Sequence, residues 1–281
     1  MAHLVTEVHV KSVMRWLELM KVRAGKRHGQ NIGLTFALFQ RPTQCTIHYY
    51  RGQPDPALPL QTSLERFCYE RGVEWWDEEK ITLLEESMRV SFQKLSSEFF
   101  RPDEPLPITD EEWEMKMRHY GLPSRMLDVS LNYLTALYFA CWQGLGDFAV
   151  WEFRRDMFKE FAPKRTNTSA TFVSPTRHFD ARITAQEGVF IRQNSVGRSF
   201  SEALAEALNI ESMVYLRKGR DLQDETQYED IAFEESVIIK WIFASSLRES
   251  ARNYLIDNDH FGKRLFPDLD GAVETIMAKL I

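Results

Sequence analysis

Cysteine is scarce in this sequence, and no long apolar run occurs in it. The three cysteines, Cys45, Cys68 and Cys141, are odd in number and widely spaced, as in reducing compartments, where thiols stay free and are usually buried. No stretch approaches the roughly 20 apolar residues of a membrane-spanning helix. The first thirty residues are too charged for the core of a signal peptide. The sequence therefore predicts a cytoplasmic protein without a membrane partner.

An excess of positive charge is also missing. The net charge is −6 and the predicted pI is about 5.7, which argues against a general nucleic-acid coat. The charge is uneven, because residues 1–50 hold seven Lys and Arg against two Asp and Glu, whereas residues 74–114 hold four against thirteen. Solvated helix faces explain both regions most simply. A basic arm that meets an acidic partner is the alternative.

Several enzyme signatures are absent. The sequence has no Gly-x-Ser-x-Gly elbow, Walker loop, Gly-x-Gly-x-x-Gly or His-Glu-x-x-His motif, which removes several common hydrolase, nucleotide-binding and metalloprotease classes. Cys45 and His48 have the spacing of a metal-ligand pair, but no second pair accompanies them. No metal site is predicted.

Hydrophobic periodicity predicts an α+β protein whose first half is helical and whose strands cluster later. The length of 281 residues and the 44% hydrophobic content are those of a globular chain with a full core. We expect an N-terminal helical arm at 1–43 and a core at 44–281. Helices are predicted at 9–24, 63–71, 81–99, 109–118, 131–142, 201–208, 246–257 and 269–280. Strands are predicted at 46–50, 126–130, 148–153, 182–192 and 237–243, with a loop at 160–180.

The first motif of interest is Tyr50-Arg51-Gly52-Gln53, at the end of a predicted strand. An arginine there can point a permanent charge and five donors at a phosphate. Glycine lets a ligand or another segment approach closely. An Arg51 paired with a carboxylate at a turn is the alternative.

The second motif runs from His119 to Ser130 and places His, Tyr, Arg, Asp and Ser beside an apolar predicted helix. A functional role competes with a structural one, in which Arg125 pairs with Asp128 and Ser130 caps the helix.

The third motif contains Glu187. In a regular strand at 182–192 this carboxylate would share a face with Ile183 and Val189, which is costly unless it serves a site. A bulge at Gly188 that turns Glu187 to solvent is the alternative.

Together these segments resemble the FRG-domain family, which is named for its Phe/Tyr-Arg-Gly signature. The matching pieces are Tyr50-Arg51-Gly52-Gln53, the run from His119 to Asp128, and Ala136–Ala140, within a family core at about 44–145. More distantly, the order of Arg51, Asp128-Val129-Ser130 and Glu187 is similar to that of ADP-ribosyltransferases. Two departures stand out: Leu127-Asp128 replaces small hydroxyl residues, and Ala185 replaces an expected Gln or Glu. The second disfavours arginine as the acceptor.

The resemblance implies an ADP-ribosyltransferase-like mixed β-sheet core that binds NAD as its substrate and needs no metal. Glu187 and Arg51 would be catalytic, Glu187 on the ribose and Arg51 on a phosphate or ribose. The residues implied in binding the dinucleotide are Arg51, Gly52, Gln53, His119, Tyr120, Arg125, Asp128, Ser130, Tyr138 and Gln186. Ser130 or Asp128 would order the strand behind the nicotinamide, and Tyr138 or Tyr120 would stack on its ring.

The leading hypothesis is thus a protein that transfers ADP-ribose to an unknown macromolecular acceptor or hydrolyses NAD, as a toxin or defence effector. Two alternatives remain. In one, the same residues form a non-catalytic module that binds a nucleotide or a partner. In the other, the protein is an enzyme directed at nucleic acid, whose target meets the basic N-terminal arm.

Overall fold

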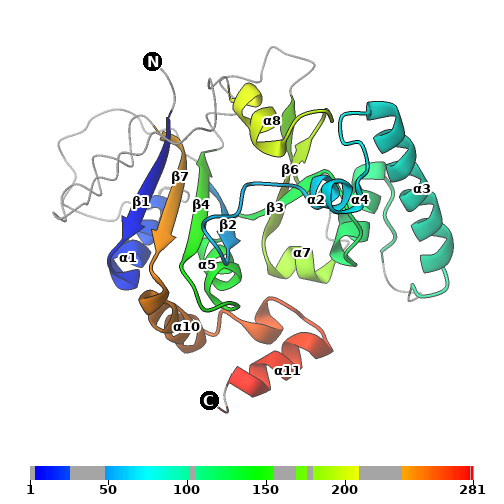
Figure 1. Ribbon diagram of the computed structural model, residues 1–281. Coiled ribbons are helices and arrows are strands. Elements are labelled where there is room, and N and C mark those ends of the chain that lie inside the picture. The colour runs from blue at the N-terminus through cyan, green and yellow to red at the C-terminus, as the bar shows by residue number, and fades with distance from the viewer. Residues whose placement is uncertain are drawn as a thin grey trace. The chain divides into compact units, whose positions relative to one another are not determined.

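The computed structural model describes residues 4–25, 48–100, 105–154, 169–175, 180–208, 236–278 and 280. The chain divides into two compact units. Unit 1 comprises residues 1–57, 130–163 and 214–261, and unit 2 comprises residues 58–129, 164–213 and 262–281. Each unit thus draws on three separate stretches of the sequence, and Figure 1 labels the elements of both.

The sheet of unit 1 has its strands in the order β1-β7-β4-β2. These strands are β1 (Leu4–Val10), β7 (Ser236–Phe243), β4 (Phe148–Arg154) and β2 (His48–Gln53). β1 runs parallel to β7, whereas β4 is antiparallel to both β7 and β2. The sheet is therefore mixed, and the predicted α+β class is confirmed.

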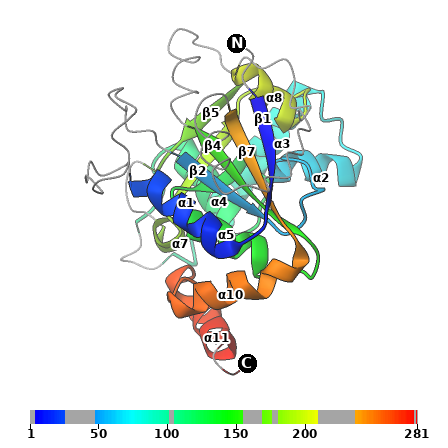
Figure 2. The same cartoon turned by 90° about the vertical axis from the view of Figure 1, so that its left-hand side faces the viewer.

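Helices α1 (Val13–Gly25) and α5 (Tyr133–Cys141) cover one face of this sheet, and Figure 2 shows both on the same side of the strands. The buried ring of Trp16 packs edge-on against Tyr133, at 6.0 Å between ring centroids, and against Phe243, at 5.2 Å. Asn132 begins α5 by accepting a hydrogen bond from the Leu134 amide. A short 3-10 helix (Ser245–Leu247) and α10 (Arg248–Asp257) complete the described part of the unit.

In unit 2 the strands follow the order β3-β6-β5. They are β3 (Met126–Ser130), β6 (Gly188–Gln193) and β5 (Ala170–Val173). The helices are α2 (Ser63–Arg71), α3 (Glu78–Ser96), α4 (Asp110–His119), α7 (Ala181–Ala185), α8 (Phe200–Ala207) and α11 (Leu269–Ala278), the last preceded by a 3-10 turn (Gly262–Arg264). One core cluster lies around Leu64, Cys68 and Ile81, and another around Met115, Met126 and Phe190.

Several helix boundaries agree with the capping chemistry of the sequence. α2 covers the predicted residues 63–71, because Thr62 accepts from the Glu65 amide and Gly72 ends the helix in the left-handed conformation. Thr109 begins α4 as predicted by accepting from the Glu112 amide. The capping box predicted at Ser246 and Glu249 is wrong, since Leu247 occupies the N-cap of α10 without a side-chain hydrogen bond.

Three other expectations are corrected by the structure. Residues 9 and 10, predicted as helix, belong to β1, which pairs with β7. Residues 182–185, predicted as part of a strand, belong to α7 (Ala181–Ala185), and the strand begins only at Gly188. The predicted loop at 160–180 contains β5, whose Phe172 pairs with Ile191; residues 160–168 and 176–179 of this loop lie outside the described part.

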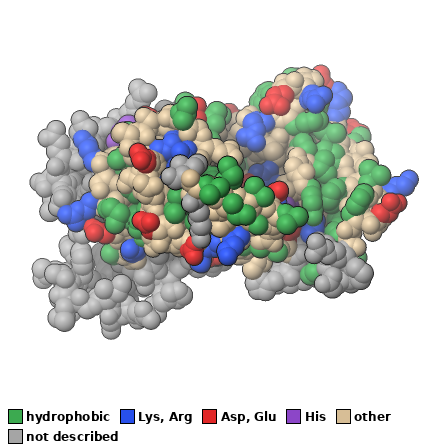
Figure 3. All heavy atoms as spheres, turned by 90° about the horizontal axis from the view of Figure 1, so that it is seen from below, with side chains coloured by type: hydrophobic (Ala, Val, Ile, Leu, Met, Phe, Trp, Pro, Cys, Tyr) green, Lys and Arg blue, Asp and Glu red, His purple; other side chains and the backbone are tan. Residues whose placement is uncertain are grey.

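Helix α11 exposes a stripe of apolar side chains. Figure 3 views the molecule from the side on which α11 lies in Figure 1, and hydrophobic side chains gather near the middle of that view. The large exposed residues of this stripe are Leu269, Val273, Ile276, Met277 and, just after the helix, Leu280. None of the described helices has the length and apolar content to cross a membrane.

Candidate functional site

Gly52 sits where α5 crosses β2 at close range. A Cβ atom at this position would overlap the carbonyl oxygen of Ala136 and would lie 2.5 Å from the Ala140 nitrogen. Only glycine allows this approach. Because side chains alternate along a strand, Arg51 and Gln53 point to the opposite face of the sheet from α5. The close approach of α5 to Gly52 thereby determines the face of the sheet on which the Arg51 side chain lies.

On that opposite face, Arg51 belongs to a row of side chains that crosses the sheet. Trp151 of β4 pairs with Arg51 in register, and Lys240 of β7 pairs with Trp151. The Lys240 ammonium lies 5.0 Å from the Trp151 ring centroid and 3.0 Å from a Glu7 carboxylate oxygen. Trp151 also donates to the Gln53 side chain at 2.6 Å. Two cations therefore flank one aromatic ring in a single row.

On the helix-covered face, the sheet holds a fully buried carboxylate, Glu152. Arg23 donates to one of its oxygens at 2.8 Å, and His48 Nδ1 lies 2.6 Å from the same atom. Trp241 donates to the other oxygen at 2.9 Å. Burial alone would raise the pKa of Glu152, but attraction to Arg23 and His48 outweighs it and lowers the pKa to about 2. This cluster ties α1 to three strands beside the Arg51 motif.

In unit 2, the two charged residues of the second motif pair with partners outside it. Asp128 receives a two-pronged ion pair from Arg118, whose third nitrogen donates to Ser63 at 2.6 Å. Arg125 is buried and donates to Glu85 of α3 at 2.7 and 2.8 Å. The predicted pairing of Arg125 with Asp128 is therefore wrong, although both residues do have structural partners.

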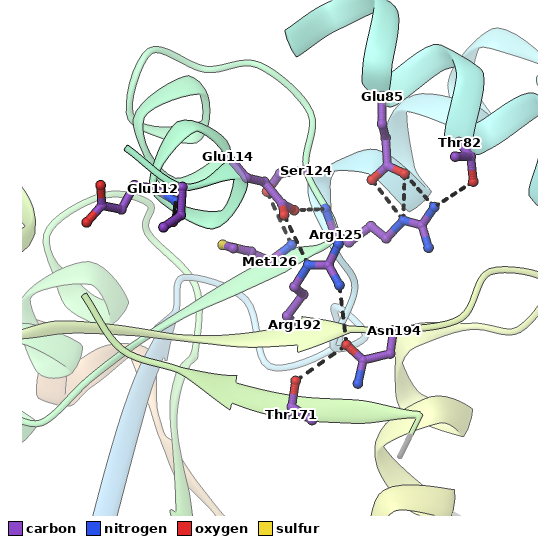
Figure 4. A network of polar contacts seen from close by, with 11 residues as sticks. Thr82, Glu85, Glu112, Glu114, Ser124, Arg125, Met126, Thr171, Arg192 and Asn194 are labelled. Carbon is purple, nitrogen blue, oxygen red and sulfur yellow. Dashed lines mark hydrogen bonds and ion pairs between the residues drawn. The ribbon is translucent and has the colours of Figure 1, made fainter. Parts of the chain in front are cut away.

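Glu114 of α4 links this segment to the strands of unit 2, as Figure 4 shows. One of its oxygens accepts from the Arg125 backbone amide at 3.2 Å, and the other accepts from Arg192 at 3.1 Å. Arg192 and Thr171 both donate to the Asn194 side chain at 3.4 Å. The arginines of this network are held by carboxylates and by an amide oxygen, so their main role in this conformation is structural.

A second carboxylate, Asp180, gathers polar groups at the start of α7. Its Oδ2 lies 2.5 Å from His119 Nδ1 and 3.3 Å from Lys116 Nζ. Its Oδ1 accepts from the Arg182 and Ile183 amides at 2.9 and 3.1 Å. Burial alone would raise the pKa of Asp180, but the hydrogen bond and attraction to His119, with the Ile183 amide and Lys116, lower it to about 2.

Glu187 lies at the turn between α7 and β6, immediately before the strand. It is exposed and adopts φ +49°, which is rare for a residue with a side chain. The predicted placement on an apolar strand face is wrong, because Gln186 ends α7 and the strand starts after Glu187. Glu187 is exposed, as expected for the alternative of a bulge at Gly188. The end of α7, and not a bulge, gives Glu187 this position.

The model of the FRG domain matches residues 46–147. The chain carries an FRG domain. The matched range includes the Arg51 motif and the His119–Ser130 segment, whereas Asp180 and Glu187 lie beyond it. No curated protein and no solved structure matches the chain.

The remaining predicted residues of the FRG domain differ in accessibility. Tyr138 is buried in the unit 1 core with its ring 4.9 Å from that of Trp142, so it is not a surface platform for a nicotinamide. Tyr120 is 62% exposed and stacks on His119 at 4.9 Å. Buried Ser130 accepts from the Asn132 amide and thereby shapes the turn before α5, which Asn132 caps. Beyond the FRG domain, Gln186 donates to the Leu265 carbonyl at 3.2 Å.

Other important residues escaped the sequence analysis. Buried Arg248 donates to the carbonyls of Cys141, Gln143 and Gly146 at 3.0, 2.5 and 2.6 Å, and to Pro54 at 3.3 Å. It thus donates hydrogen bonds to backbone carbonyl groups at the C-terminal end of α5 and to the carbonyl of Pro54, the residue after the Arg51 motif. No spacing signal links residues so far apart. Asp180 had a detectable signal, since aspartate is a preferred N-cap, but the strand predicted at 182–192 hid it.

The structure gives no indication of a metal centre in the part of the chain that it describes. There, no group of three or more His, Cys, Asp and Glu side chains could hold a metal ion. Of the cysteines, Cys68 and Cys141 are buried free thiols, as predicted. Cys45, half of the weak metal-ligand pair, lies outside the described residues.

Proposed function

We propose that the protein cleaves the nicotinamide–ribose bond of NAD and transfers the ADP-ribose to an acceptor or to water. The observation that carries the proposal is Glu187, an exposed carboxylate in a left-handed backbone conformation directly before β6. A non-glycine residue in this conformation costs about 1–2 kcal/mol. Such strain is typical of positions where a side chain must be presented for function. A carboxylate at a strand start also matches the third motif of the resemblance.

The chemistry assigns separate roles to Glu187 and Arg51. Cleavage of the bond passes through an oxocarbenium-like state, which a nearby carboxylate stabilises while it binds a ribose hydroxyl. Arg51, in unit 1, carries a guanidinium whose permanent charge and donors suit a phosphate. In the row that crosses the sheet of unit 1, Trp151 and Lys240 are buried and Lys240 pairs with Glu7, so Arg51 is the member that supplies positive charge for a ligand.

A non-catalytic nucleotide-binding module is the second candidate. It is favoured by the ion pairs of Arg125 with Glu85 and of Arg118 with Asp128, because these motif residues are engaged in scaffolding. In this reading the nucleotide is bound and released unchanged.

Incubation of the full chain with NAD labelled in the nicotinamide tests the proposal. The wild type is expected to release nicotinamide, and Glu187→Gln is expected to lower kcat by at least 100-fold while the Kd for NAD changes little. Glu111→Gln, an exposed glutamate of α4, is the matched control. Saturable NAD binding without turnover would favour the binding module, and neither binding nor turnover would reject both candidates.

A further inference from the structure

His119 and Asp180 form an oriented imidazole–carboxylate pair in unit 2. The His119 Nδ1 atom lies 2.5 Å from Asp180 Oδ2. The Asp180 side chain is 1% exposed, whereas the His119 side chain is 16% exposed. The pair therefore has a buried end at the carboxylate and an accessible end at the imidazole.

The surroundings of Asp180 keep it a hydrogen-bond acceptor. Lys116 lies 3.3 Å from the oxygen that His119 contacts, and two backbone amides of α7 donate to the other oxygen. A carboxylate that cannot donate requires the proton to be on Nδ1 of His119. In the neutral imidazole, Nε2 is then the basic nitrogen, on the ring edge away from Asp180. Tyr120 stacks on one face of the ring at 4.9 Å, and 16% of the His119 side chain stays exposed.

We propose that His119 is the general base that removes a proton from the acceptor of ADP-ribose, with Asp180 as its positioning residue. This inference rests on the proposed function and deepens it, since it defines the acceptor class. An imidazole whose far nitrogen is held by a buried carboxylate is the arrangement that orients a base toward an attacking group.

The step balances in the following way. The acceptor oxygen bonds to the anomeric carbon of the ribose as the bond from that carbon to nicotinamide breaks. Nicotinamide leaves with the bonding electron pair, and the acceptor proton moves to His119 Nε2 and then to solvent. A base is needed only where the attacking atom carries a proton that it must lose. The acceptor is therefore a group whose attacking atom carries a proton, such as the hydroxyl of water or of a macromolecule.

Helix α7 connects this pair to Glu187. Asp180 is the N-cap of α7, Gln186 ends the helix, and Glu187 follows at once. A helical path of seven residues spans about 10 Å. The same carboxylate that orients His119 therefore also anchors the short helix that presents Glu187. The general base and the ribose-binding acid thus share one structural support.

The decisive experiment compares His119→Gln and Asp180→Asn with the wild type in the full chain. Asparagine caps helices as well as aspartate does, so Asp180→Asn removes the charge and keeps the cap. We expect His119→Gln to lower kcat by about 100- to 10,000-fold with little change in the Kd for NAD. Asp180→Asn is expected to lower kcat by at least tenfold. His9→Gln on β1 is the matched control and is expected to keep the wild-type kcat.

Two further readouts separate catalysis from a structural effect. The acid limb of the wild-type pH–rate profile should disappear in His119→Gln, because that limb reports protonation of an essential base. The groups known to face His119 are Asp180, the Tyr120 ring and, through Asp180, Lys116. Added imidazole should restore turnover to His119→Ala. Free ADP-ribose as product identifies water as the acceptor, and labelled macromolecule identifies a partner as the acceptor.

The outcomes separate this inference from the proposed function. Nicotinamide release by the wild type that His119→Gln leaves unchanged in rate and pH dependence overturns the role of His119 alone. A variant with weakened NAD binding and unchanged kcat overturns it too, because His119 would then bind the dinucleotide. Absence of NAD turnover in the wild type overturns the proposed function, and the role of His119 with it.

Discussion

Gly52 lies so close to the carbonyl oxygen of Ala136 that no side chain fits at position 52. We therefore expect Gly52→Ala to push α5 away from β2 and to lower the free energy of unfolding by about 3 kcal/mol. Chemical denaturation of both proteins measures this loss. Gly146→Ala is the control, because a Cβ there meets no atom within 4 Å. Equal losses in the two variants would show that the close approach does not matter.

Glu187 and Asp259 are the two described non-glycine residues with positive φ. Glycine relieves the backbone strain, so Glu187→Gly and Asp259→Gly are each expected to raise the free energy of unfolding by on the order of 1 kcal/mol. Only Glu187→Gly is expected to abolish NAD turnover. A loss of stability in Glu187→Gly would instead assign the Glu187 side chain a structural role.

The buried carboxylate Glu152 makes the stability of the fold sensitive to acid. Its pKa falls from 4.5 to about 2 on folding, so its stabilising contribution is complete above pH 4.5. The contribution disappears as the pH falls toward 2, and it amounts to about 3 kcal/mol. Asp180 shifts in the same direction, from 3.8 to about 2. Urea denaturation at several pH values between 7 and 2.5 should show this loss.

The variant Glu152→Gln isolates that contribution. It is expected to be less stable than the wild type by about 3–5 kcal/mol at pH 7, because Arg23 stays buried without its carboxylate. Its stability should then change less between pH 5 and pH 2.5. Glu249→Gln, on the exposed side of α10, should keep the wild-type pH dependence. An unchanged acid dependence in Glu152→Gln would contradict this account.

Arg248 holds the end of α5 and the residue after the Arg51 motif through backbone carbonyls. Lysine keeps the charge but lacks the planar set of donors, so Arg248→Lys leaves several carbonyls unsatisfied. We expect a loss of about 2–3 kcal/mol in the free energy of unfolding. Arg66→Lys, exposed on α2, is expected to have little effect. A tolerated Arg248→Lys would show that water replaces these bonds.

Local patterns in the sequence predicted most elements well. α2, β3 and the start of α4 follow from capping residues and apolar spacing that act over a few positions. The strand predicted at 182–192 is confirmed only from Gly188, and its first part is wrong for a physical reason. Ile183, Val189 and Ile191 suit a strand pattern, but Asp180 caps a short helix with two backbone hydrogen bonds, and this local competition decides the conformation.

The candidate site was predictable in part. The Arg51-Gly52 motif indicated a close approach at the glycine, and Gly52 shows one with Ala136. The partners of Arg125 and Asp128 could not be predicted, because Glu85 and Arg118 are brought to them by packing of α3 and α4. The pairing of His119 with Asp180 spans 61 positions, and no local pattern encodes such a contact.

Glu187 is the residue that we propose to serve the cleavage of NAD. Single-turnover release of labelled nicotinamide by the wild type and by Glu187→Gln, with NAD binding and folding measured on the same samples, tests this role most directly. We expect release by the wild type and at least a 100-fold slower release by a folded, NAD-binding Glu187→Gln. Equal rates in the two proteins, or no release by the wild type, would contradict this role.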